Sequence, residues 1–76
     1  MNLLLLEDDH DLGRAVADHL AVAGHAVQWC RLIAEAWDAM APDLALIDLH
    51  LPDGDGLSLL RMWRAGGQLW PVIVLT

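Results

Sequence analysis

The sequence predicts an α/β fold built on a parallel sheet with both faces covered. Four short apolar segments alternate with three stretches of helical periodicity, a pattern typical of strands joined by right-handed crossover helices. The apolar segments are continuous rather than alternating, which indicates strands that are buried on both faces. We therefore expect four strands and three helices within the 76 residues of a single domain.

The first strand and helix are predicted over the first 24 residues. "NLLLLE", residues 2–7, is a continuous apolar run that ends in acids and is typical of a buried strand. Asp9 suits the N-cap of a following amphipathic helix, and Gly24 suits its end. The apolar stripe of this helix recurs every four residues, at Leu12, Val16 and Leu20.

The remaining elements follow in the same alternation. Strands are expected at "HAVQWC" (25–30), "DLALID" (43–48) and "PVIVLT" (71–76). Ile33, Trp37 and Met40 predict a short helix that Pro42 ends, and Leu57, Leu60 and Trp63 predict another that ends at Gly66 and Gly67. We expect "PDGDG" (52–56) to be a sharp turn. The four tryptophans occupy apolar positions and are expected in the core: Trp29, Trp37, Trp63 and Trp70.

Composition excludes several classes of function. The formal net charge is −7 and all four basic residues are Arg, which argues against a surface for nucleic acid or for an anionic membrane. Cys30 is the only cysteine, so no internal disulfide can form. No apolar run approaches the ~20 residues of a membrane span, and the N-terminus lacks the features of a signal peptide. We therefore expect a cytoplasmic protein.

Polar residues follow three of the predicted strands. Glu7 and Asp8 end the first strand, Asp48 ends the third, and Thr76 ends the fourth. Ligands of open α/β sheets bind at the carboxyl edge, where these residues would converge if the three strands are neighbours. Like charges ~4 Å apart repel by roughly 4 kcal/mol at an effective dielectric of 20, so a proton or a cation must relieve them. Carboxylate oxygens in a small acidic site suit Mg²⁺.

An Asp beside Mg²⁺ suggests phosphoryl chemistry. An aspartate can attack phosphorus and form an acyl phosphate, while the cation offsets the charge on the transferring oxygens. Thr76 would offer a hydroxyl to a phosphoryl oxygen only when phosphate is present, which would make a switch.

Three motifs together resemble the receiver domain of bacterial two-component response regulators. They are "LLLLEDD", "DLALIDLHLPDGDGLSLLRMWR" and "PVIVLT", and they span Leu3 to Thr76. The resemblance implies a flavodoxin-like, doubly wound parallel sheet with strand order 2-1-3-4, incomplete after the fourth strand. It implies that Asp48 is the phosphorylated residue and that Thr76 supplies the switch hydroxyl. It also implies Mg²⁺ bound by Glu7, Asp8, Asp48 and the backbone carbonyl of His50.

The resemblance also implies partners. A sensor histidine kinase would donate the phosphoryl group, and the pattern is closest to the transcription-factor subfamily that carries a winged-helix DNA-binding domain. Residues 1–76 would then be the N-terminal portion of the receiver. The family's Lys at the end of a fifth strand, its dimerisation face and the DNA-binding domain have no counterpart in this chain, which contains no Lys.

Three alternatives remain. "PDGDG" could suggest a calcium loop, but the Asp spacing and final Glu of that loop are absent. A phosphotransferase of the haloacid-dehalogenase type would place a second Asp two residues after Asp48, where this chain has His50. A receiver-like module that only binds partners would not need the acidic residues. We therefore expect a phosphoryl acceptor and not a classical enzyme.

Overall fold

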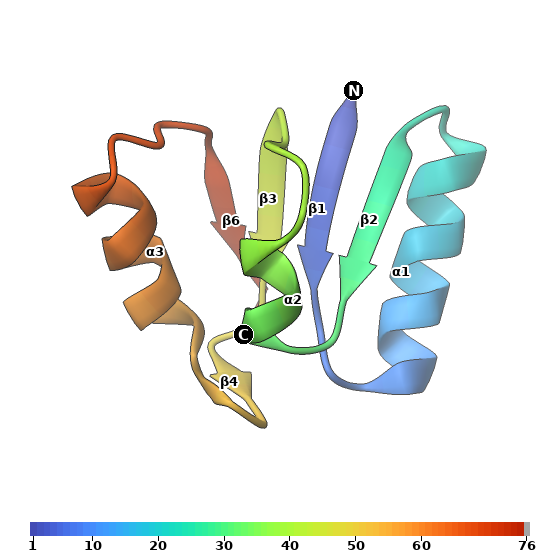
Figure 1. The fold of residues 1–76 in the computed structure, drawn as a ribbon. Coiled ribbons are helices and arrows are strands. Elements are labelled where there is room, and N and C mark those ends of the chain that lie inside the picture. The colour runs from blue at the N-terminus through green and yellow to red at the C-terminus, as the bar shows by residue number, and fades with distance from the viewer. Residues whose placement is uncertain (76) are drawn as a thin grey trace.

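The computed structural model describes residues 1–75, and its centre is a four-stranded parallel sheet with the order β2-β1-β3-β6 (Figure 1). This arrangement confirms the predicted α/β class, the three helices and the order of the four sheet strands. The strands are β1 (Asn2–Leu6), β2 (Ala26–Cys30), β3 (Leu44–Ile47) and β6 (Val72–Val74). The helices are α1 (His10–Val22), α2 (Ile33–Trp37) and α3 (Gly56–Ala65). Within residues 1–75, no helix has the length and apolar character needed to span a membrane.

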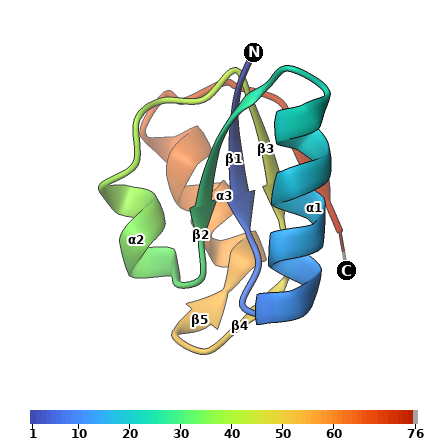
Figure 2. The same ribbon diagram turned by 90° about the vertical axis from the view of Figure 1, so that its right-hand side faces the viewer.

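The sheet lies between two helical layers, with α2 and α3 on one face and α1 on the other (Figure 2). The larger core lies on the α2–α3 face, where alternate residues of β1 and β3 pack against α3. Its members are Leu4, Leu6, Ala36, Ala45, Ile47, Leu59 and Trp63, together with the free Cys30. Burying each of the large aliphatic side chains stabilises the fold by roughly 1.5–3 kcal/mol, which explains why the continuous apolar runs become the central strands.

The face covered by α1 is less complete. Gly13 is the buried residue of α1, while Val16 and Leu20 are half-buried and Leu12 is 49% exposed. The predicted apolar stripe is therefore only partly covered. Ile73 of the edge strand β6 is also 49% exposed, because α1 is the only helix on this face among residues 1–75 and lies at the opposite edge of the sheet.

The segment after β3 is more regular than the predicted turn. Residues His50–Leu51 form β4 and Gly54–Asp55 form β5, an antiparallel hairpin that the sequence analysis did not predict. Pro52 and Asp53 make its tip, and Gly54 adopts a φ of +154°, a conformation that other residues rarely adopt. Each strand has only two residues, too few for the apolar alternation that reveals a strand in sequence.

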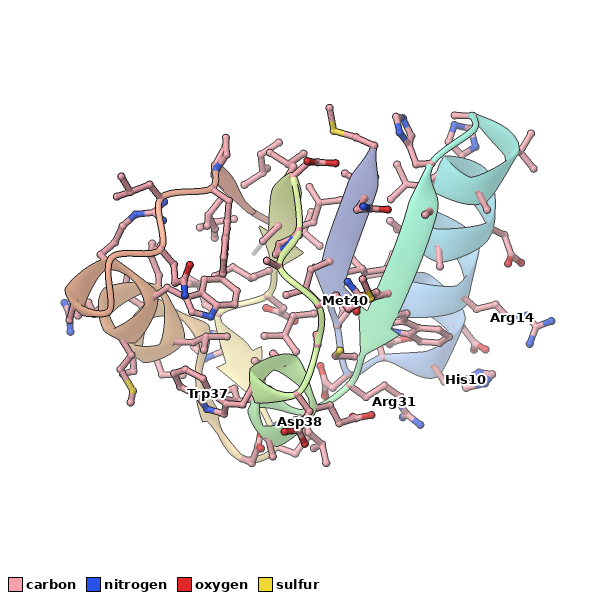
Figure 3. The ribbon with its side chains drawn as sticks, turned by 45° about the horizontal axis from the view of Figure 1, so that its top comes forward. His10, Arg14, Arg31, Trp37, Asp38 and Met40 are labelled. Carbon is pink, nitrogen blue, oxygen red and sulfur yellow. The ribbon has the colours of Figure 1, made fainter. Side chains whose placement is uncertain are left out.

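The predictions for Trp37 and Met40 were wrong. The helix ends at Trp37, so Met40 lies outside it, and both side chains are exposed, by 49% and 74% respectively (Figure 3). Ala36 is the residue that α2 buries, and neighbouring helix residues point about 100° apart, so Trp37 faces outward. Of the other tryptophans, Trp63 is buried, and Trp29 and Trp70 are half-buried.

Side-chain carboxylates cap all three helices. Asp9 accepts a hydrogen bond from the backbone N–H of Leu12 at 2.9 Å, which confirms its predicted role as the N-cap of α1. Asp55 caps α3 in the same way. Leu32 at the start of α2 has no acceptor in its side chain, so Asp53 of the hairpin tip caps this helix instead. Its two oxygens accept from the backbone N–H groups of Ile33 and Ala34 at 2.8 and 3.0 Å.

We predict a pH-dependent contribution of Asp53 to stability. The two backbone hydrogen bonds lower the pKa of Asp53 below its ordinary value of 3.8. Its contribution is therefore complete above that value and is lost as the pH falls through the lowered pKa of the folded state. Asp53→Asn should reduce the free energy of unfolding at neutral pH, and the difference from wild type should shrink in acid. Urea titrations at several pH values measure this. The exposed Asp38→Asn is the control, and a deficit that does not change with pH would contradict the prediction.

Candidate functional site

Three carboxylates converge at the carboxyl edge of the sheet. Glu7 and Asp8 follow β1 and Asp48 follows β3, and each offers an oxygen within 4.8 Å of the others. Parallel pairing of Leu6 with Ile47 places the two strand ends side by side. The ladder continues into the site, because the N–H of Asp48 donates to the carbonyl of Leu6 at 2.9 Å. The predicted convergence of these three residues is therefore observed.

The cluster is largely removed from water. Glu7 is 2% exposed and Asp48 is 8% exposed, while Asp8 is half-buried. Burial raises the pKa of Glu7 above its ordinary value, and the negative charge of Asp48 raises it further. One hydrogen bond opposes this shift, from the backbone N–H of Asp9 to Oε2 of Glu7 at 3.1 Å. The site thus holds negative charge at a cost that either a proton or a cation would reduce.

The β4–β5 hairpin is held close to Asp48. The N–H of His50 donates to Oδ1 of Asp48 at 3.2 Å, and the side chain of His50 is exposed. The N–H of Gly56 donates to the carbonyl of Leu49 at 2.8 Å. A Cβ on Gly56 would lie 2.2 Å from the carbonyl oxygen of Asp48, so only glycine permits this approach. The first residue of α3 thereby packs directly on the backbone of Asp48.

The fourth predicted strand end falls at the limit of the described chain. The N–H of Leu75 donates to the carbonyl of Ile47 at 2.8 Å, so the chain still runs beside β3 at that point. Thr76, the predicted switch residue, lies outside the described residues.

Two further side chains contact the site and were not predicted from the sequence as site residues. Arg31 donates from Nε and Nη2 to the carbonyl of Asp8 at 3.2 and 2.9 Å. Trp29 donates from its indole nitrogen to the carbonyl of Glu7 at 3.0 Å. The predicted strand order was the one feature of the sequence that could have indicated these two contacts. The end of the second strand lies beside the end of the first in a 2-1-3-4 sheet, so its polar donors could reach the same edge.

The residues present fit a hard cation. All three acidic side chains offer oxygen atoms, the ligands that Mg²⁺ prefers. An open pocket of about 490 Å³ beside Asp8 leaves room for bound water; it is lined by Asp8, Arg31, Leu32, Glu35 and Pro52. The arrangement can therefore hold a metal ion next to a strand-end aspartate.

Comparison with curated proteins gives relatives among transcriptional regulators. The chain is 52% identical over 79 aligned positions to the swarming motility regulation protein RssB of Serratia marcescens, and 40% identical to the virulence transcriptional regulatory protein PhoP of Salmonella typhimurium. Both alignments cover 100% of this chain but only 36% and 35% of those proteins. The chain therefore spans about a third of the length of these relatives.

Solved structures with the same fold include a receiver domain and a response regulator. The non-phosphorylated HemR receiver domain of Leptospira biflexa superposes with a TM-score of 0.89 and 34% identity, covering 96% of this chain and 61% of that one. The MaeR response regulator bound to beryllium trifluoride gives a TM-score of 0.90 and 28% identity, covering 100% and 66%. Residues 3–76 also match the family described as the response regulator receiver domain. The chain belongs to the response regulator receiver domain family of two-component systems.

Proposed function

We propose that this chain accepts a phosphoryl group on Asp48 from a sensor histidine kinase, with Mg²⁺ as cofactor. The observation that carries the proposal is the cluster of Glu7, Asp8 and Asp48, whose carboxylates gather at the carboxyl edge with little access to water. Membership of the receiver-domain family supports it. So does the solved MaeR relative, which is bound to beryllium trifluoride.

In the proposed reaction, a carboxylate oxygen of Asp48 attacks the phosphorus of a phosphohistidine on the kinase. The new P–O bond makes an acyl phosphate, the P–N bond breaks, and its electron pair returns to the imidazole nitrogen, which takes up a proton. The Mg²⁺ ion would be held by Glu7, Asp8, Asp48 and the backbone carbonyl of His50, and would offset the charge on the phosphoryl oxygens. The hydroxyl of Thr76 would bind the transferred group.

The proposal extends to the surrounding protein. This chain covers 61% and 66% of the two solved relatives described above, which supports residues 1–76 as the N-terminal portion of a receiver domain. The transcriptional regulators among its relatives support an output in gene regulation, through a DNA-binding domain. Dimerisation of the longer protein and a cytoplasmic location complete the proposal.

Phosphorylation of Asp48 is directly testable by mass spectrometry. The full-length protein incubated with Mg²⁺ and acetyl phosphate should gain the mass of one phosphoryl group, and chelation of the metal should abolish the gain. Asp48→Asn should remain unmodified, because its amide cannot form the acyl phosphate. Asp38→Asn makes the same chemical change at an exposed position and should be modified like wild type. A phosphoryl gain that survives in Asp48→Asn would falsify the assignment.

A second prediction concerns Glu7 and the metal-free protein. Because the folded state raises the pKa of Glu7 above 4.5, the stability that this group contributes is present below 4.5 and is lost as the pH rises through the raised value. Glu7→Gln keeps an acceptor for the N–H of Asp9 but removes the charge. In a metal chelator at neutral pH, the variant should therefore be more stable than wild type.

Mg²⁺ should reverse this ranking. An ion that binds only the folded state at 100 times its Kd stabilises the protein by ~2.7 kcal/mol, and Glu7→Gln should gain much less because a neutral amide replaces one negatively charged ligand. Thermal melts with chelator and with Mg²⁺, from mildly acidic to neutral pH, measure both effects. Asp38→Asn controls for the loss of one negative charge. A variant that is less stable than wild type in chelator at neutral pH contradicts the prediction.

A further inference from the structure

The loop that carries Glu7 and Asp8 is held by side chains from the end of β2. The register that pairs Leu6 with Cys30 places this end beside the loop. Trp29 donates to the carbonyl of Glu7 at 3.0 Å, and Arg31 donates through two nitrogens to the carbonyl of Asp8 at 3.2 and 2.9 Å. Two consecutive backbone carbonyls therefore accept hydrogen bonds from side chains.

The peptide between Asp8 and Asp9 is bonded at both ends. Its carbonyl accepts from the guanidinium of Arg31, and its N–H donates to Oε2 of Glu7 at 3.1 Å. The last backbone bond of the ladder joins the N–H of Glu7 to the carbonyl of Cys30 at 3.0 Å, and beyond it these side chains restrain the loop. Fixing the peptide planes on both sides of a residue limits the directions in which its side chain can point. Here the residue is Asp8, and its carboxylate is the group that is restrained.

The two donors are themselves held in place. A Cβ on Gly13 would lie 2.3 Å from the indole ring of Trp29, so a glycine in α1 makes the space that this ring occupies. The backbone N–H groups of Arg31 and Leu32 both donate to Oε1 of Glu35 at 3.0 Å. The start of α2 thus anchors Arg31, and the inner face of α1 receives Trp29.

We propose that Trp29 and Arg31 are positioning residues that preorganise Asp8 and Glu7 for Mg²⁺, an inference that rests on the proposed metal site. Arg31 has two opposing effects on the affinity for Mg²⁺. Its positive charge near the site repels a cation and weakens metal binding. Its two hydrogen bonds hold the loop in the binding geometry and lower the ordering cost of metal binding. We expect the second effect to be the larger one, because two N–H groups of Arg31 bond the same carbonyl oxygen.

Calorimetric titration of the full-length protein with Mg²⁺ tests the inference. Arg31→Met should weaken Mg²⁺ binding by about tenfold, the lower end of the range for residues that orient metal ligands, although it removes a repelling charge. Arg31→Lys keeps the repelling charge but cannot make the forked contact, so it should bind Mg²⁺ no more tightly than Arg31→Met does. Trp29→Phe fills most of the same space without the N–H donor and should weaken binding severalfold.

Arg14→Met is the matched control. Arg14 makes an exposed contact of 3.8 Å with Asp18, and it projects outward from α1, whereas Arg31 lies between α2 and the start of α1 (Figure 3). The substitution removes the same charge without touching the loop, so Mg²⁺ affinity should be unchanged or slightly tighter.

Three outcomes would overturn the inference. If Arg31→Met binds Mg²⁺ as tightly as Arg14→Met does, the charge alone matters. If Arg31→Met and Trp29→Phe lower the melting temperature but leave the Mg²⁺ affinity of the folded protein unchanged, the two residues are only structural, and the proposed function stands. If wild type itself does not bind Mg²⁺, the inference fails together with the proposed metal site.

Discussion

The parallel pairing of β1 with β3 is the constraint on which the rest of the site depends. Leu6 lies opposite Ile47, so the next residue of each strand, Glu7 and Asp48, must emerge at the same edge. The apolar residues of both strands are almost completely buried, and their packing holds the two strands side by side. The hydrophobic core therefore fixes the position of the carboxylates, and it does so against their mutual repulsion.

The cost of that repulsion explains the chemistry that the edge can perform. A carboxylate such as Glu7, buried beside another, binds a proton more readily than one in water, as its raised pKa indicates. The same field attracts a cation, which can replace the proton without losing the negative oxygens that act as ligands. Stability of the metal-free fold and affinity for a metal are thus opposed at this edge, and the core supplies the stabilisation that tolerates the conflict.

The sequence predicted the parts of the fold that depend on long apolar runs. The four sheet strands, the Asp9 cap and the acidic cluster follow from residue type and chain order, because a parallel sheet brings alternate loops to one edge. It was harder to predict which side chains of each helix are buried. Trp37 is exposed because α2 turns Ala36 and, in part, Ile33 toward the core, while Leu12 of the predicted α1 stripe is 49% exposed. The role of Arg31 depends on a contact across 23 positions, which no local pattern reveals.

The loops at the carboxyl edge are joined to one another by side chains more than by backbone pairing. Arg31 ties the β2–α2 segment to the loop after β1, and Asp53 ties the hairpin after β3 to the start of α2. His50 in turn connects the hairpin to the carboxylate of Asp48. Each of these hydrogen bonds has either a guanidinium donor or a carboxylate acceptor, so the strength of each depends on the local electric field. Together these contacts hold the loop that carries Asp8 and the hairpin beside Asp48 close to the N-terminus of α2.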